Sequence, residues 1–241
     1  GAGRAVRGFR SHARPSCRKM CQAARADERG RTGPRPVLPP RIWWGDADSV
    51  ERLEFWQCRR SAEDLPHVTH VCNTASNGVP IPMEARIRDV KYLDLEMLDA
   101  PGMSPGTGVW NRNELGIRHA LAFIEEAYAG GGVILVNCYA GQNRSGAVLL
   151  AWLLTHRNSE TKAPLGFSVE GAKAHLRSIE PDALNNSSLE RCALHVADVA
   201  VQVPAAVPRL WQLTAPTRAA PCEASVIIEE EEDAAGLEPL F

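Results

Sequence analysis

The stretch GGVILVNCYAGQNRSG, residues 131–146, carries the strongest indication of both fold and chemistry. Its segment VILVNC (133–138) is apolar almost to its end, which is typical of a short strand buried on both faces of a sheet. Cys138 ends this strand, Gly141 follows in a loop, and helical periodicity begins at Arg144. The order of strand, thiol, glycine turn, arginine and helix predicts a loop that binds an anion beside a nucleophile.

The chemistry of such a loop follows from its position between two elements. Between the carboxyl end of a strand and the amino end of a helix, unpaired backbone N–H groups point into one concavity and favour negative charge there. The same field favours the thiolate form of Cys138. Arg144 adds a planar guanidinium that matches two phosphate oxygens at once. We therefore interpret the loop as a phosphate-binding site.

The rest of the chain alternates between the periodicities of strands and helices. This alternation predicts an α/β fold with a central, mostly parallel sheet of about five strands flanked by helices. Residues 101–108 read as a flexible loop, and Gly130, Gly131 and Gly132 should end a helix. We expect strands at 41–46, 67–75, 90–98 and 133–138, and helices at 49–62, 117–128, 144–156, 168–178 and 188–200.

Three parts are expected along the chain. Residues 1–40 form a basic tail, free of acidic residues up to position 26, and a proline-rich linker, RTGPRPVLPPR (31–41), that should lack regular structure. Residues 41–202 form the catalytic domain, and 203–241, with the run EEEED, form a flexible tail. The spacing of arginines in the first part fits either an organelle presequence or a plain basic tail. We expect a cytoplasmic protein if this part is a plain tail, and organelle targeting is the alternative.

Composition excludes several classes of function. With a net charge of -2 over 241 residues, the chain offers no broad field for nucleic acid, and no apolar stretch is long enough to span a membrane. The 7 cysteines are odd in number and scattered, which favours a reducing compartment over a disulfide framework. Cys17 and Cys21 lack the further ligands of a zinc site, so no metal or other cofactor is expected.

Residues 137–154, NCYAGQNRSGAVLLAWLL, resemble the dual-specificity phosphatases, a branch of the cysteine-dependent protein tyrosine phosphatases. The resemblance covers about residues 41–200. RIWWGD and HVTHVCNTA look like the family's opening strands, and EGAKAHLRSIEPDALNN (170–186) is similar to its helix and asparagine-containing segment after the active site. The resemblance implies a phosphatase-like fold with a Cys-x5-Arg phosphate-binding loop.

The resemblance also implies a reaction and a role for each residue. Cys138 would attack the phosphorus of phosphotyrosine, phosphoserine or phosphothreonine in a phosphorylated protein, and water would hydrolyse the cysteinyl phosphate. Asp99 would be the general acid and then the base, and Ser145 would hydrogen-bond the thiolate. The backbone amides of the loop would hold the phosphate together with the Arg144 side chain; they belong to Tyr139, Ala140, Gly141, Gln142, Asn143 and Arg144.

Three positions depart from the family pattern. Asn137 stands where the family usually has histidine before the nucleophile. The stretch between Asp99 and Cys138 is longer than usual, and Asp94, inside the expected strand, is a poorer candidate for the acid. Glu180 stands before Pro181 in place of the family's arginine.

These departures leave two other classes of function open. Asn137 favours a catalytically weak pseudophosphatase that binds phosphoproteins or serves as an assembly component. A related loop could serve sulfur transfer or arsenate reduction, but those reactions usually need a different loop or a resolving cysteine nearby. Cys72 and Cys192 are interpreted instead as buried core thiols.

Overall fold

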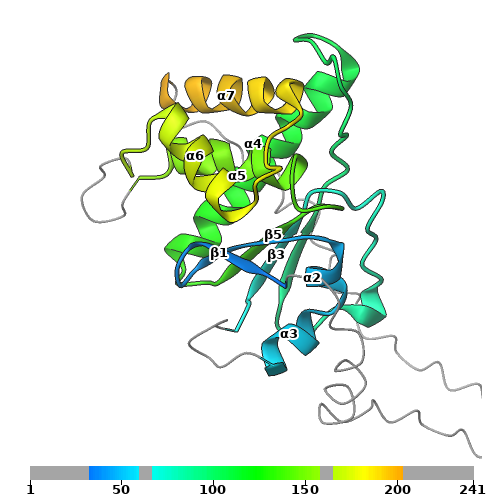
Figure 1. Ribbon diagram of the computed structural model, residues 1–241. Coiled ribbons are helices and arrows are strands. Elements are labelled where there is room, and N and C mark those ends of the chain that lie inside the picture. The colour runs from blue at the N-terminus through cyan, green and yellow to red at the C-terminus, as the bar shows by residue number, and fades with distance from the viewer. Residues whose placement is uncertain (1–32, 60–66, 158–164, 203–241) are drawn as a thin grey trace, which may run out of the picture. The chain divides into compact units, whose positions relative to one another are not determined.

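The computed structural model describes residues 33–59, 67–157 and 165–202 (Figure 1). Its centre is a 5-stranded sheet in the order β1-β2-β5-β3-β4. β1 pairs antiparallel with β2, and the other neighbours pair in parallel. The predicted α/β fold with a mostly parallel sheet is therefore confirmed. The strands are β1 (Arg35–Leu38), β2 (Ile42–Gly45), β3 (His70–Asn73), β4 (Lys91–Asp94) and β5 (Ile134–Asn137).

Helices cover both faces of this sheet (Figure 1). One face carries α4 (Gly108–Ala129), α5 (Arg144–Thr155), α6 (Val169–Ile179) and α7 (Ser187–Gln202), and the other carries α2 (Ala47–Glu51) and α3 (Leu53–Arg59). The short 3-10 helix η2 (Met83–Ala85) lies in the connection to β4. Side chains alternate along β5, so that Ile134 and Val136 enter the core under α4–α7 while Leu135 enters the core under α2 and α3.

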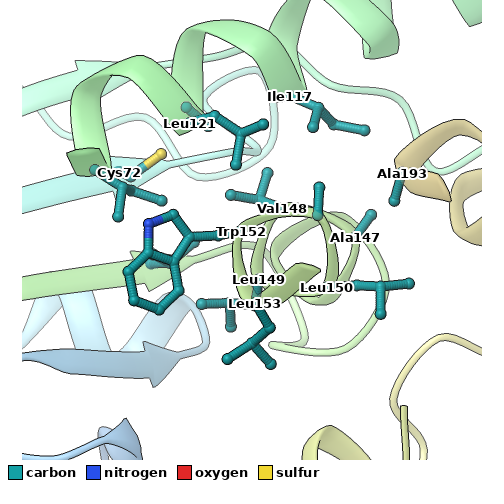
Figure 2. Close-up of a cluster of buried hydrophobic side chains, with 14 of the residues drawn as sticks. Cys72, Ile117, Leu121, Ala147, Val148, Leu149, Leu150, Trp152, Leu153 and Ala193 are labelled. Carbon is teal, nitrogen blue, oxygen red and sulfur yellow. The ribbon is translucent and has the colours of Figure 1, made fainter. Parts of the chain in front are cut away.

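The helix that follows the candidate loop is the most deeply buried helix of the fold. Every residue of α5 from Ser145 to Leu153 is buried. Figure 2 shows its apolar side chains among residues of α4, α7 and β3, including Ile117, Ala193 and Cys72. Cys72 and Cys192 are both fully buried, which confirms their interpretation as core thiols.

Two of the expected local structures are wrong. The proline-rich linker contains β1, because an edge strand leaves one side unpaired and so tolerates the missing N–H of Pro36. The single helix expected over 49–62 is two helices, α2 and α3, interrupted at Arg52. Asp46 and Ser49 form a capping box that starts α2 at Ala47.

The other boundaries differ by smaller amounts. The helix expected from 117 begins at Gly108, where the side chain of Thr107 accepts a hydrogen bond from the Trp110 N–H group, and it ends at Gly130 as predicted. β4 ends at Asp94, short of the expected position 98. The predictions for residues 1–32 and 203–241, which include the basic and acidic tails, lie outside the described residues.

The burial of α5 predicts that truncating one of its side chains destabilises the protein. Leu149→Ala is expected to lower the free energy of unfolding by about 2–5 kcal/mol, because it leaves a cavity in a fully packed region. Leu115→Ala on α4 is the matched control, since Leu115 is 51% exposed and its truncation should change stability by less than about 0.5 kcal/mol. Urea unfolding measures both variants, and equal losses would contradict the buried position of α5.

Candidate active site

The candidate site lies where the parallel strands β2, β5 and β3 end at the same edge of the sheet. β5 leads into Cys138, and α5 begins at Arg144, so the loop between them faces solvent beyond the carboxyl ends of the strands. The loop is tied to the neighbouring segment, because the N–H group of Ala47 donates to the Tyr139 carbonyl at 3.1 Å. Gly141 has φ +65, and a Cβ atom there would lie 2.9 Å from the Gly45 carbonyl oxygen. The loop therefore requires glycine at this position.

The loop presents donors that no other described residue uses. The backbone N–H groups of Tyr139, Ala140, Gly141, Gln142 and Asn143 donate to no acceptor within residues 33–59, 67–157 and 165–202. Tyr139 is 63% exposed and Ala140 is also exposed, so these two residues form an open rim. A group of unpaired amides beside a helix amino end is suited to an oxyanion.

The thiol of Cys138 sits at the base of this loop and is 2% exposed. The Ser145 hydroxyl donates to its sulfur at 3.1 Å, and the indole N–H of Trp44 donates to the Ser145 oxygen at 2.8 Å. Because an indole nitrogen can only donate, Trp44 leaves the single hydroxyl hydrogen of Ser145 free to point at the sulfur. Trp44 thus orients Ser145, which in turn contacts the candidate nucleophile.

Sequence reasoning missed the role of Trp44. The stretch RIWWGD by itself predicts only an opening strand, and nothing in a single sequence shows that β2 lies beside β5. Once the strand order is known, Trp44 is opposite Val136, near the end of the strand that leads to Cys138.

Arg144 is placed for ligand binding at the start of α5. Its Nη1 lies 3.5 Å from the Met97 carbonyl oxygen, a contact at the limit of a hydrogen bond. Its Nε is buried and has no partner among the described residues. A buried donor without an acceptor costs free energy, and a bound oxyanion would relieve that cost.

The structure brings Asp99 to the same loop despite the long intervening segment. One carboxylate oxygen accepts a hydrogen bond from the Asn143 amide at 3.1 Å, and the other accepts one from the Asn186 amide at 2.7 Å. Asn143, expected only to contribute its backbone, therefore also links the loop to the candidate acid. Asp94, the alternative acid, is instead engaged by Arg86 and by the Asn73 amide.

Asn186 connects three parts of the site. Besides its bond to Asp99, its backbone N–H donates to the Asn143 side-chain oxygen at 3.1 Å. Its own side-chain oxygen accepts from the N–H groups of Ser188 and Leu189, at the start of α7. The asparagine-containing segment after α6 thus fixes the candidate acid, the loop and the amino end of α7 together.

Asn113 of α4 holds the backbone immediately before Asp99. Its fully buried side chain accepts a hydrogen bond from the Leu98 N–H at 2.8 Å and donates to the Leu98 carbonyl at 2.9 Å. A primary amide matches a peptide group in this two-bond arrangement, which fixes the direction in which the chain enters Asp99. The helical periodicity of α4 gave no indication of this residue, because a polar residue within a helix usually faces solvent.

Asn137, the residue that replaces the family's histidine, is fully buried between β3 and β5. Its side-chain amide lies 3.3 Å from the Asn73 side-chain oxygen, and its carbonyl accepts two bonds from Thr74, at 2.9 and 2.8 Å. Its own side-chain oxygen has no partner among the described residues. Asn137 thus anchors the end of β5 and adds no charge beside Cys138.

Comparison with known proteins identifies the family. The model of the dual specificity phosphatase catalytic domain matches residues 60–181, about half of the chain. The chain belongs to the dual-specificity phosphatase family. Dual specificity protein phosphatase 22-A of Danio rerio is 28% identical over 88 residues, and this match spans only 36% of each chain.

Solved structures of dual-specificity phosphatases share the fold. A mouse protein assigned to the dual specificity phosphatases, complexed with zinc tungstate, superposes with a TM-score of 0.55 at 22% identity, over 73% of this chain and 92% of its own. Human DUSP28 superposes with a TM-score of 0.51 at 24% identity, over 71% of this chain and 97% of its own.

Two further features of the described residues bear on the site. Within the part of the chain that the structure covers, no group of three or more His, Cys, Asp or Glu side chains is arranged to hold a metal ion. The helices in the same part are all too short or too polar to cross a membrane.

The cysteines of the folded domain should differ in reactivity. Burial raises the pKa of the Cys72 thiol, and burial with nearby Glu114 raises the pKa of Cys192 to about 12. Both thiols therefore stay protonated near neutrality and become thiolates only at much higher pH. We expect iodoacetamide at pH 7 to alkylate Cys138 faster than Cys72 or Cys192, as measured by mass spectrometry of the three peptides.

Adding an oxyanion tests whether the alkylation of Cys138 occurs at the loop. Phosphate or tungstate should slow the alkylation of Cys138 and leave Cys72 and Cys192 unaffected, because only Cys138 adjoins the loop amides. Equal rates for all three cysteines in the folded protein would contradict this assignment.

Proposed function

We propose that this chain is an active protein phosphatase that hydrolyses phosphotyrosine, phosphoserine or phosphothreonine through a cysteinyl-phosphate intermediate. The observation that carries the proposal is the set of N–H groups at residues 139–143, which have no acceptor among the described residues and lie next to Cys138 at the carboxyl end of β5. Membership of the dual-specificity phosphatase family supports the same activity.

In the first step the Cys138 sulfur attacks phosphorus. The S–P bond forms as the bond between phosphorus and the leaving oxygen breaks, and Asp99 gives that oxygen a proton. The loop amides and the Arg144 guanidinium bind the three non-bridging oxygens. These donors are already oriented before the reaction, so they stabilise the negative charge of the transition state. Arg144 Nε, buried and unpartnered among the described residues, is one such group.

In the second step water attacks the cysteinyl phosphate. Asp99, now a carboxylate, accepts a proton from the water, while the S–P bond breaks and the electron pair returns to sulfur. The Ser145 hydroxyl, 3.1 Å from the sulfur, stabilises the departing thiolate. Trp44 keeps that hydroxyl in the required orientation through its own bond to the Ser145 oxygen.

The acid assigned to Asp99 can be tested with two leaving groups. Asp99→Ala should lower kcat/KM, which reports the steps up to the cysteinyl phosphate, by about 10²–10⁴-fold on a phosphoserine peptide, because an alkoxide leaves poorly without a proton. The loss on p-nitrophenyl phosphate should be much smaller, because nitrophenoxide leaves without help. Asp94→Ala is the matched control, since Asp94 is bound to Arg86 and Asn73, and it should leave both rates near those of wild type.

Cys138→Ser is the inactive control for this experiment. The variant should lose turnover on both substrates but still bind tungstate through the loop amides, as measured by calorimetry. Full turnover by Cys138→Ser, or equal losses on the two substrates for Asp99→Ala, would overturn the assigned roles. The assays are run with and without a metal chelator, which should leave the rates unchanged.

A phosphoprotein-binding pseudophosphatase is the second candidate function. Asn137 is the observation that favours it, since a neutral buried side chain replaces a group that can carry a charge near the thiolate. The alternative retains the amides and Arg144 for binding but lacks efficient turnover.

Asn137→His separates the two candidates. We expect wild type to hydrolyse substrate already, and the variant to extend the acid limb of the kcat/KM profile to lower pH, because an imidazolium favours a nearby thiolate. Thermal unfolding of the variant checks that the larger ring is accommodated between β3 and β5. If wild type binds phosphopeptides without turnover and Asn137→His restores hydrolysis, the binding module is the correct function.

A further inference from the structure

An ion pair lies behind the phosphate-binding loop and joins two distant parts of the chain. Arg35 of β1 contacts Glu180, the residue that follows α6, through one guanidinium nitrogen. The two side chains are only 18% and 15% exposed. The other terminal nitrogen of Arg35 lies 3.4 Å from the Gly141 carbonyl oxygen, in the middle of the loop. Arg35 precedes the residues that match the family model.

We propose that Arg35 and Glu180 form a brace that positions the phosphate-binding loop for oxyanion binding. The proposal rests on the proposed function, because it concerns how that same loop is held. Both are positioning residues, since Arg35 contacts the loop from β1, Glu180 contacts Arg35, and neither contacts a reacting group.

The contact with Gly141 fixes the direction of a donor. In a planar trans peptide the carbonyl of one residue and the N–H of the next point in opposite directions. A guanidinium that holds the Gly141 carbonyl therefore also holds the Gln142 N–H, directed away from Arg35. That N–H is one of the loop donors without an acceptor among the described residues. The brace thus keeps this donor turned toward the space that the phosphate occupies.

A second contact leads from Arg35 to the nucleophile. The guanidinium carbon lies 5.5 Å from the centroid of the Trp44 ring, within the range of a cation–π interaction. The same ring donates to Ser145, which donates to the Cys138 sulfur. Arg35 thereby supports both the loop backbone and the side chain that orients Ser145.

Glu180 makes the brace nearly neutral and ties it to the candidate acid. Its carboxylate balances the charge of Arg35, so the pair does not itself form a second anion site. The segment that begins at Glu180 continues to Leu184, which packs near Gly146, and then to Asn186, which bonds Asp99. Because this segment is held at its start by Arg35, the brace also limits how far Asn186 can move.

The brace can be tested against an ion pair of the same burial. Arg35→Met should lower kcat/KM by about 10–100-fold and weaken inhibition by vanadate by a similar factor, because the loop amides lose their alignment. Lys173→Met is the matched control, since Lys173 pairs with Glu190 at 2.8 Å with side chains 15% and 17% exposed, on α6 and α7. The control should lose comparable thermal stability and keep kcat/KM and vanadate affinity.

Two more variants keep the test decisive. Arg35→Lys retains the charge but not the fork that reaches both Glu180 and Gly141, so its vanadate affinity should fall between those of wild type and Arg35→Met. Glu180→Gln should show the same direction of change as Arg35→Met, and it replaces that variant if Arg35→Met does not fold. If the brace variants match the Lys173→Met control in kcat/KM and vanadate affinity, the proposal is wrong.

This experiment also separates the brace from the proposed function. An active wild type with unaffected brace variants overturns the brace alone. An inactive wild type overturns the proposed function, and tungstate binding measured by calorimetry then tests the brace directly, with weaker binding expected for Arg35→Met. Absence of both turnover and tungstate binding in wild type would overturn both proposals.

Discussion

The site depends on a set of backbone N–H groups for which the described part of the chain provides no acceptors. Residues 139–143 connect a buried strand to a buried helix, and none of their N–H groups donates to another described residue. Such a segment is stable only if the surrounding structure holds it, because these N–H groups gain no protein hydrogen bonds among the described residues to offset the lost freedom of the chain. The close approach of Gly141 to Gly45 and the bond from Ala47 to Tyr139 supply that support.

Neutral amide side chains do much of the positioning around this loop. Asn143 and Asn186 bond the two oxygens of Asp99, and Asn113 bonds both polar groups of the Leu98 backbone. A primary amide can donate and accept at once without changing charge with pH, so it fixes a carboxylate without neutralising it. In the proposed reaction, Asp99 would therefore be held in one place while it changes between acid and base.

The sequence predicted the central part of this arrangement because its pattern is local. A buried apolar run, a thiol, a glycine and an arginine at the start of a helix lie within one short stretch, and each has a direct structural consequence. Trp44, Arg35 and Asn113 were not found, because their contacts depend on strand order and on how α4 packs, which no single segment encodes. The strand at Pro36 could not be predicted for the same reason, since the effect of a proline depends on whether its strand lies at an edge.

Asn137 places a neutral, buried side chain immediately before Cys138. The sulfur of Cys138 is contacted by the Ser145 hydroxyl, whose orientation comes from Trp44, and the loop amides beside it are dipoles of fixed direction. The charges of Arg35 and Glu180 offset each other behind the loop, which leaves Arg144 as the cation that begins α5. Stabilisation of negative charge by fixed dipoles needs no reorganisation during the reaction, provided that the dipoles are held rigidly. With a neutral residue before Cys138, the proposed reaction depends more on the residues that hold the loop rigid, and in our proposal these include Arg35 of β1.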